Sequence, residues 1–462
     1  MTEIESLDNA KVSRKHFSWT MIASLGDFLD AGMFAGTGIT LGAVATLLNF
    51  STLQAGLPAL ITLLGTAFGA LGFGRLGDKF GRKFIYQVDM IIYAVAAILL
   101  GFTGFLPTRM LNIVWAMVFY ALVGIAVGAD VPTSWSLIVE FSPKNARGKL
   151  FSLTNVMWYV AVLVELAFAI ALVNTGMVLF RTIWFLLGIV AIISWFLRRR
   201  LAESPRYQLM KGETKNLDET LSSLGINNVD KKLQAKETYS IRKYSELFRK
   251  YGKYMLFAWF LYLMWGIPAS TYGEFFPYIF NSLGLVSARE TFAFEAIYFG
   301  SAIVPGILIF SLLVDKVGRT PLYLASALMC AVSFFLLVYP PFLTNVGVLL
   351  VSFLLFGIGQ GLGVWPVTRL LSMEHFPTSL RNSGQGFIWF TMRFEAAVFG
   401  LFTPLIIGLK GVHVEYIGWI AGLFFVAAFI VVAALSKIAP EYVKTEQKSL
   451  EETSNDSVLV AS

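Results

Sequence analysis

Three aspartates lie inside long apolar stretches of this sequence, where a charged carboxylate is energetically costly. Asp27 and Asp30 are three residues apart, and therefore on one face of a helix, while Asp130 lies in a later stretch. An ionised acid near the middle of a bilayer costs at least about 3 kcal/mol, so these groups must be neutral, paired or hydrated. Neighbouring buried acids can bind and release protons as a unit. We predict that Asp30, with Asp27 or Asp130, forms a proton site; the alternative is a structural hydrogen-bonding role.

Two arginines in apolar stretches of the second half of the chain could bind an anion. Arg369 and Arg393 each offer a planar fork that matches a carboxylate or a phosphate. The alternative is that they neutralise Glu374 or Glu395. Glu165 is another deep acid, and both Glu165 and Glu395 fit either a cavity wall or the pairing of two helices. We include Arg369, Arg393, Glu165 and Glu395 among the predicted substrate-binding residues.

Aromatic side chains in the same stretches could wall a cavity that binds a ring or the face of a sugar. Most tryptophans of membrane proteins pack against helices or anchor at the interface, so we expect only two or three of these side chains to contact the substrate. The aromatic candidates are Trp158, Trp265, Tyr272, Trp365 and Trp389.

A pair of charged motifs occurs twice, each time between two apolar stretches. The pattern D-x-x-G-R is followed by E-x-x-P-x-x-x-R about sixty residues later. We predict that these charges form networks that hold one conformation and break in another, so that they act as a conformational gate. The alternative is that they are anchoring charges in loops. The gate residues are Asp78, Gly81, Arg82, Glu140 and Arg147 in the first copy, and Asp315, Gly318, Arg319, Glu374 and Arg381 in the second.

Composition places the chain in a membrane. Hydrophobic residues make up 56% of the 462 residues and charged residues only 14%, which is more apolar surface than a soluble domain can bury. Continuous apolar runs of about 20 residues can be placed twelve times, so we predict an all-α membrane protein with two pseudo-symmetric bundles of six helices. The predicted parts are a tail (1–16), a bundle (17–198), a linker (199–253), a bundle (254–438) and a second tail (439–462).

Basic residues determine the expected orientation. They concentrate in the loops that carry the repeated motifs and in the linker, which by the positive-inside rule places both termini in the cytoplasm of a protein of the cell membrane. The same bias explains the net charge of +7, so nucleic acid is not an expected partner. The basic linker is expected to lie along anionic membrane lipids.

Catalytic chemistry is not expected. The sequence has one cysteine, Cys330, and we find no metal-ligand cluster, phosphate-binding loop or nucleophile motif. We therefore predict that the protein is not an enzyme and uses no cofactor or metal. Because one chain holds both halves of a pathway, we expect a monomer.

The repeated motifs also carry a family resemblance over nearly the whole chain. With Glu203 to Arg206 they resemble the major facilitator superfamily, and within it the sugar porters and metabolite:proton symporters. The resemblance implies two six-helix bundles around a central cavity with alternating access. It aligns Asp30 with the aspartate of proton-coupled sugar porters and Asn155 with a sugar-binding glutamine. Tyr120 and Arg369 depart from the sugar-porter pattern, and the Asp27 and Asp30 pair is closer to phosphate and aromatic-acid symporters.

The predicted function is secondary active transport of a small polar metabolite, driven by proton symport. The departures from the sugar-porter pattern favour an organic acid over a sugar. Two alternatives stay open: an exporter of drugs or metabolites that works by proton antiport, and a nutrient sensor that binds its ligand without transporting it.

Overall fold

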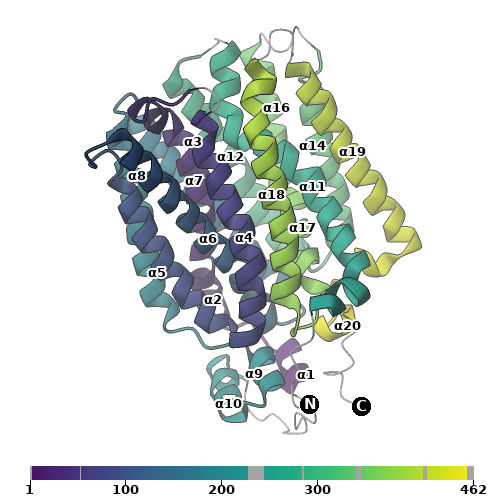
Figure 1. Cartoon of the computed structure of the whole chain (residues 1–462). Coiled ribbons are helices and arrows are strands. Elements are labelled where there is room, and N and C mark those ends of the chain that lie inside the picture. The colour runs from purple at the N-terminus through teal and green to yellow at the C-terminus, as the bar shows by residue number, and fades with distance from the viewer. Residues whose placement is uncertain are drawn as a thin grey trace.

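The computed structural model describes residues 3–51, 54–226, 244–283, 286–339, 341, 345–408 and 414–454. The side chains of 271–283 and 400–408 lie outside this description, and so does that of the predicted site residue Tyr272. Within the described ranges the regular structure is entirely helical. Long helices run roughly side by side along the molecule (Figure 1).

The helices of the first half form from the apolar stretches before Arg199. Their bounds are α2 (Arg14–Ala23), α3 (Leu25–Leu47), α4 (Leu57–Phe80), α5 (Arg82–Gly101), α6 (Arg109–Phe141), α7 (Arg147–Ala171) and α8 (Met177–Arg198). The turn η1 (Gln54–Gly56) precedes α4.

The helices of the second half follow the linker. Their bounds are α11 (Tyr244–Leu283), α12 (Ala288–Pro305), η2 (Gly306–Phe310), α13 (Ser311–Leu313), α14 (Arg319–Phe335), α16 (Val346–Gly359), η3 (Gln360–Val364), α17 (Trp365–Glu374), α18 (Arg381–Gly408) and α19 (Val414–Ile438). The helix α11 begins ten residues, or nearly three turns, before the predicted start of the second bundle at residue 254, because this first part is rich in polar residues and does not read as a membrane span.

The predicted number of membrane crossings agrees with the structure. Among the described residues, nine continuous helical segments are long and apolar enough to span a bilayer. The helices α11, α14 and α18 complete the set of twelve. Large apolar side chains such as Phe68 and Leu256 are 56% and 62% exposed on the outside of the bundle, as expected of a protein whose surrounding solvent is hydrocarbon. The prediction of an all-α membrane fold is confirmed.

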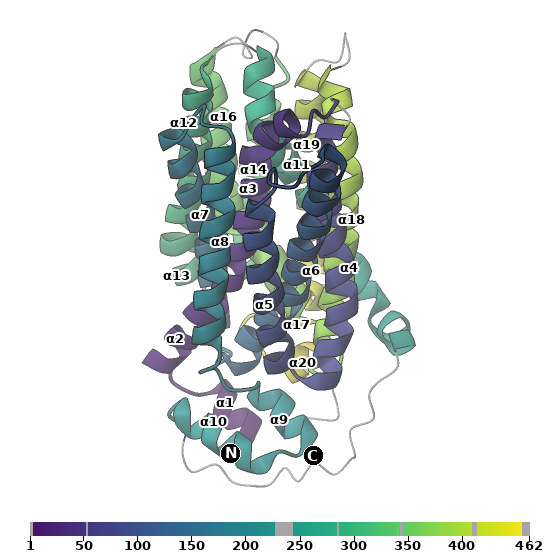
Figure 2. The same cartoon turned by 60° about the vertical axis from the view of Figure 1, so that its left-hand side comes forward.

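Short helices cover one end of the long ones. The helices α1 (Glu3–Asp8), α9 (Pro205–Lys211) and α20 (Leu450–Ser454) lie beneath the bundle in both views (Figures 1 and 2). The repeated motifs are at the same end as α1 and α20, and we call it the motif end. The helix α10 (Thr214–Ser223) and the turn η4 (Pro440–Tyr442) are also there.

The two halves touch along two pairs of helices. The helix α4 packs along α18, and α7 packs along α12. A Cβ added at Gly74 would fall 2.6 Å from the carbonyl oxygen of Asn382, and one at Gly386 would fall 2.3 Å from that of Ala70. Glycine at both positions lets these backbones approach, as small residues do at helix interfaces in membranes.

Three of the membrane crossings contain an irregular segment. The first crossing is broken at Ser24 between α2 and α3, and the segments η2 and η3 are π-helical turns next to Pro305 and Pro366. Proline and π-helical turns leave backbone groups free of the regular helical pattern and are frequent at functional sites. The second π turn begins at Gln360, which reaches the cavity described below.

Candidate transport site

A buried ion pair joins the two halves at Asp27. This aspartate is in the first turn of α3, and its carboxylate pairs with the guanidinium of Arg369 from α17. The indole nitrogen of Trp135 also donates to Asp27 at 3.0 Å, and Arg369 donates to the side-chain oxygen of Asn155 at 2.6 Å. The guanidinium lies 3.7 Å from the centre of the Trp135 ring, a favourable cation–π distance. These contacts hold the guanidinium of Arg369 in place.

A second ion pair between the halves lies one helical turn further along α3. The guanidinium of Arg393, from α18, is 2.5 Å from the Asp30 carboxylate, and the indole of Trp158 donates to the same carboxylate at 2.9 Å. Arg393 is also 4.7 Å from the centre of the Trp389 ring. Unlike Arg369, which is fully buried, Arg393 is 5% exposed and borders a cavity.

Both predicted acids are therefore paired, which was one of the three states that the sequence allowed. Each arginine binds an aspartate of the first half, and not Glu374 or Glu395 as the alternative interpretation proposed. Because each aspartate has an arginine of its own, both pairs are electrically balanced with the acids ionised. Breaking either pair without replacing a partner would leave a buried charge, at a cost of about 3 to 5 kcal/mol.

The cavity beside Arg393 has walls made mainly of aromatic rings. The rings of Trp265 and Trp365 are stacked, with centroids 3.8 Å apart and planes at 13°. Among the described residues of its lining only Arg393 is charged, and Gln360 donates to the Tyr298 hydroxyl at 2.9 Å. The lining residues are Phe34, Trp158, Tyr159, Trp265, Ala269, Ser270, Tyr298, Phe299, Gln360, Trp365, Met392 and Arg393.

Four of the predicted substrate-binding residues thus meet at one cavity: Trp158, Trp265, Trp365 and Arg393. Others lie next to it and form its support. Asn155 and Arg369 belong to the Asp27 pair, and Trp389 packs 5.0 Å from Trp135. The substrate role of all these residues stays a prediction. The sequence did not point to Gln360 or Tyr298, which look like ordinary residues of apolar helices.

The two deep glutamates have different surroundings. Glu165 is fully buried on α7, and neither of its carboxyl oxygens has a hydrogen-bond partner among the described residues. Its carboxyl group lies against Gly32 of α3, where an added Cβ would be 2.8 Å from Oε1. Glu395 accepts a hydrogen bond of 2.5 Å from the Trp259 indole and so pairs α18 with α11. Neither glutamate lines the cavity.

The third predicted proton-site residue, Asp130, lies apart from the two cross-half pairs. Its carboxylate is 2.5 Å from the guanidinium of Arg198, the last residue of α8. Arg198 is also 3.6 Å from Asp89 of α5. Neither Arg198 nor Asp89 was predicted as a site residue, because both lie near the edges of apolar stretches and look like flanking charges.

At the motif end, Glu140 is shared by two arginines. Arg82 of the first half donates to it at 2.9 Å, and Arg381 of the second half at 2.7 Å. Gly81, which precedes Arg82, and Gly318 in the second copy both have φ of +97°, a conformation that glycine adopts without strain. These glycines make the sharp turns between consecutive helices.

Glu374 repeats this arrangement in the second half. It accepts from Arg319 of its own half at 3.0 Å and from Arg147 of the first half at 3.3 Å. Each glutamate thus binds the D-x-x-G-R arginine of its own half and a second arginine from the other half. The buried network therefore connects the halves at the motif end and is not confined to each of them.

The motif aspartates hold helix ends of the opposite half. Asp78 accepts from the backbone N–H groups of Asn382 and Ser383 at 3.3 and 2.9 Å, at the start of α18. Asp315 accepts from the backbone of Gly148 and Lys149 at 3.1 and 2.9 Å, at the start of α7. A carboxylate at a helix N-terminus satisfies free N–H groups and is stabilised by the helix dipole. All predicted gate charges thus contact one another or a helix end.

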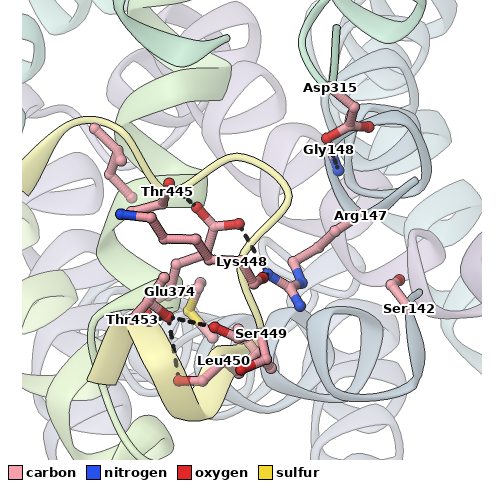
Figure 3. Close-up of polar contacts among 12 residues, drawn as sticks. Ser142, Arg147, Gly148, Asp315, Glu374, Thr445, Lys448, Ser449, Leu450 and Thr453 are labelled. Atoms are coloured by element: carbon pink, nitrogen blue, oxygen red, sulfur yellow. Dashed lines mark hydrogen bonds and ion pairs between the residues drawn. The ribbon is translucent and has the colours of Figure 1, made fainter. Parts of the chain in front are cut away.

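The C-terminal segment 440–454, which we call the strap, closes this network from below (Figure 3). Thr445 donates to a Glu374 carboxylate oxygen, and Thr453 donates to the Glu374 carbonyl at 2.6 Å. The carbonyl of Lys448 accepts from Arg147 at 3.1 Å. The sequence described this segment only as a polar tail, because it has no helical periodicity of its own.

Residues after α8 complete the motif end. Arg206 is buried and binds Glu451 of the strap at 2.8 Å and Asp8 of α1 at 2.6 Å. Glu203 accepts from the backbone N–H groups of Arg82 and Lys83 at the start of α5. Burial raises the pKa of Glu203, and the nearby Arg82 opposes that rise. Both chain ends are therefore tied to the gate.

Comparison with known proteins agrees with this architecture. Residues 9–456 match the family described as Sugar (and other) transporter. The minor myo-inositol transporter IolF of Bacillus subtilis is 30% identical over 401 residues, covering 85% of each chain. The niacin transporter NiaP of Acinetobacter baylyi is 25% identical over 453 residues, covering 94% of this chain and 97% of its own.

A solved structure of the major facilitator superfamily shows the same fold. The proton:xylose symporter XylE bound to 6-bromo-6-deoxy-D-glucose superposes with a TM-score of 0.79 and 21% identity, covering 96% of this chain and 99% of that chain. The resemblance of the repeated motifs is thereby confirmed. The chain is a multi-pass membrane transporter of the major facilitator superfamily and belongs to its sugar (and other) transporter family.

Proposed function

We propose that the protein imports a small carboxylate that carries a ring, together with a proton. The observation that carries this proposal is the pairing of Arg393 with Asp30 at the edge of an aromatic cavity. A substrate carboxylate can take the place of Asp30 on the Arg393 fork, since both present the same pair of oxygens. Asp30 then loses its cation and takes up a proton, because an unpaired buried carboxylate is costly. Substrate and proton would therefore bind together.

The cavity walls support a flat, partly apolar substrate. The stacked Trp265 and Trp365 present a rigid aromatic surface, and such surfaces favour stacking with another ring. Gln360 can hydrogen-bond a heteroatom on that ring while Arg393 holds the carboxylate. The relative NiaP is described as a niacin transporter, and niacin combines these two features.

A cyclic polyol is the second candidate. Ser270, Gln360 and Tyr298 give the cavity several hydrogen-bonding groups, and a tryptophan face can cover the apolar side of such a ring. The relative IolF is described as a myo-inositol transporter. A neutral polyol would leave the Asp30 and Arg393 pair intact, so binding would not by itself require a proton.

Transport would follow from rocking of the two bundles, 17–198 and 254–438, about the cavity. The buried charges that join the halves at the motif end support a state that is closed there. Opening this end requires the cross-half pairs to separate, as expected of a gate. We place the motif end in the cytoplasm of a cell-membrane protein on the basis of the basic residues there, with lipid around a single transporting chain.

Transport assays in liposomes test this proposal. Purified protein is reconstituted, and a pH-sensitive dye follows external pH while niacin or myo-inositol is added. We expect niacin to enter with external alkalinisation. Acidification triggered by the substrate would instead indicate an antiporter, and uptake of myo-inositol alone would favour the polyol. Absence of flux for ring carboxylates in general would contradict the proposal.

A further inference from the structure

One buried arginine in the first half faces two aspartates. The Nη1 atom of Arg198 is 2.5 Å from Oδ1 of Asp130 and 3.6 Å from Oδ1 of Asp89. The three side chains come from α8, α6 and α5 and are at most 2% exposed. Two carboxylates around one guanidinium have a net charge of −1 if both are ionised. This imbalance distinguishes the cluster from the balanced pairs at Asp27 and Asp30.

Within the described part of the chain, the excess carboxylate is poorly compensated. Both oxygens of Asp89 and the Oδ2 of Asp130 lack a hydrogen-bond partner among the described residues. The remaining guanidinium contacts go to the carbonyls of Ala23 and Tyr86 at 3.3 and 3.4 Å, and its face lies 4.0 Å from the Tyr86 ring. A buried carboxylate without donors is costly, and a shared proton removes both the charge and the missing hydrogen bond.

Among the residues that the structure describes, the elements that pack around the cluster bring acids to it and no second cation. Tyr86 and Asp89 face it from α5, Asp130 from α6 and Arg198 from α8, while the next charged group, on α3, is Asp27. Asp27 is already paired with an arginine of the other half. We infer that Asp89 and Asp130 share one proton next to the guanidinium of Arg198.

The position of the cluster indicates what this proton does. Asp130 lies directly against α3, because a Cβ added at Gly26 would be 1.6 Å from its Oδ2. Gly26 precedes Asp27, and Asp30 is one turn further toward the cavity. Asp89 is seven residues, or about 10 Å of helix, from Arg82 at the motif end. The acids thus form a series from the cavity toward the motif end.

The cluster is therefore a proton-binding site on the release side of the cavity. Its role in transport rests on the proposed proton symport, but the shared proton itself does not. When the motif end opens, the pair would pass its proton to that side and recover one from Asp27 or Asp30. Asp89 and Arg198, which lie outside the central site, thus belong to the proton pathway.

Infrared difference spectroscopy on the purified full-length protein detects the protonated carboxyl group directly. At neutral pH, the wild type should show a protonated-carboxyl C=O component that both Asp89→Asn and Asp130→Asn lose, since each variant leaves one carboxylate for one guanidinium. The contribution of the buried Glu165 should stay in every variant. Arg198→Gln should increase the signal, because the remaining pair then lacks its cation. Glu219→Gln, at an exposed position on α10, serves as the control and should change nothing. An unchanged signal in both aspartate variants would overturn the inference.

Transport assays then separate this site from the proposed function. Asp89→Asn should keep substrate exchange at equal concentrations close to wild type but reduce proton-driven accumulation by about tenfold or more, and Asp89→Glu should restore part of it. If wild type accumulates substrate with protons and Asp89→Asn does so equally well, the release role is wrong. If wild type moves no protons, the proposed function fails, and the infrared signal still decides whether the proton is shared.

Discussion

At the scale of single residues, Arg369 and Arg393 are chemically alike but differently placed. Arg369 is fully buried and held by Asp27, Asn155 and aromatic rings, whereas Arg393 touches the cavity. The sequence identified the residue types but not their partners, because Asp27 and Arg369 are 342 positions apart and no local periodicity relates them. Glu165 was predicted as a deep acid, but its lack of a hydrogen-bond partner among the described residues could not be predicted, since its neighbours come from other helices.

Arg393→Lys tests the substrate role at this scale. Lysine keeps the charge but loses the planar fork, so the KM for a ring carboxylate should rise by about tenfold or more while myo-inositol uptake changes little. Uptake kinetics in liposomes measure this difference. The control is Arg199→Lys at the exposed end of α8. An unaltered KM for the carboxylate would remove Arg393 from the substrate site.

At the scale of helices, apolar runs were sufficient to predict the crossings. Close helix packing relies on glycine, as at Gly128, where an added Cβ would be 2.2 Å from the Thr66 carbonyl oxygen. The break at Ser24 and the π turn at Gln360 could not be predicted, because they depend on neighbours from other helices. The pairing of Glu140 with Arg381 and of Glu374 with Arg147, across the two halves, could not be predicted for the same reason.

Gly74→Ala tests the contact between α4 and α18. The added methyl group meets a backbone oxygen that cannot rotate away, so the motif-end closure should lose about 1 to 3 kcal/mol and the thermal midpoint should fall. Gly72→Ala on the same helix is a matched control, because nothing lies within 4 Å of its Cβ position. Equal thermal midpoints for the two variants would show that this close approach does not support the closed state.

Glu140→Gln tests the gate. The substitution removes the charge shared by Arg82 and Arg381 and leaves two buried cations poorly compensated. We expect the protein to favour the form that is open at the motif end, with faster labelling of a cysteine introduced at the buried Thr378, whose hydroxyl contacts Arg381; the comparison is made with the Thr378→Cys chain that keeps Glu140. Glu219→Gln should label as the wild type does. Labelling of Glu140→Gln at the wild-type rate would contradict a gating role.

At the scale of the whole molecule, the two chain ends meet beneath the bundles and bind both halves. The strap contacts Arg147 and Arg206 of the first half and Glu374 of the second. Both chain ends were predicted only as tails, since short polar segments carry no periodic signal. Their fixed positions follow from the buried arginines that need acceptors.

Removal of the strap is predicted to weaken the closed state of the whole transporter. A chain that ends at Ala439 loses the Thr445 and Thr453 contacts with Glu374 and the Glu451 partner of Arg206. Its thermal midpoint should fall, and proteases should cleave the motif end faster. A chain that ends at Ser454 keeps these contacts and is the control. Equal proteolysis of both truncated chains would show that the strap does not stabilise closure.

The most direct test of the account is the ratio of protons to substrate moved by wild type and by Asp30→Asn in the same liposomes. We predict that a ring carboxylate enters wild-type liposomes with external alkalinisation. We predict that Asp30→Asn still exchanges substrate but neither moves protons nor accumulates substrate against a gradient. Substrate entry in the wild type without proton movement, or full uphill transport by Asp30→Asn, would contradict the central claim that a substrate carboxylate replaces Asp30 on Arg393.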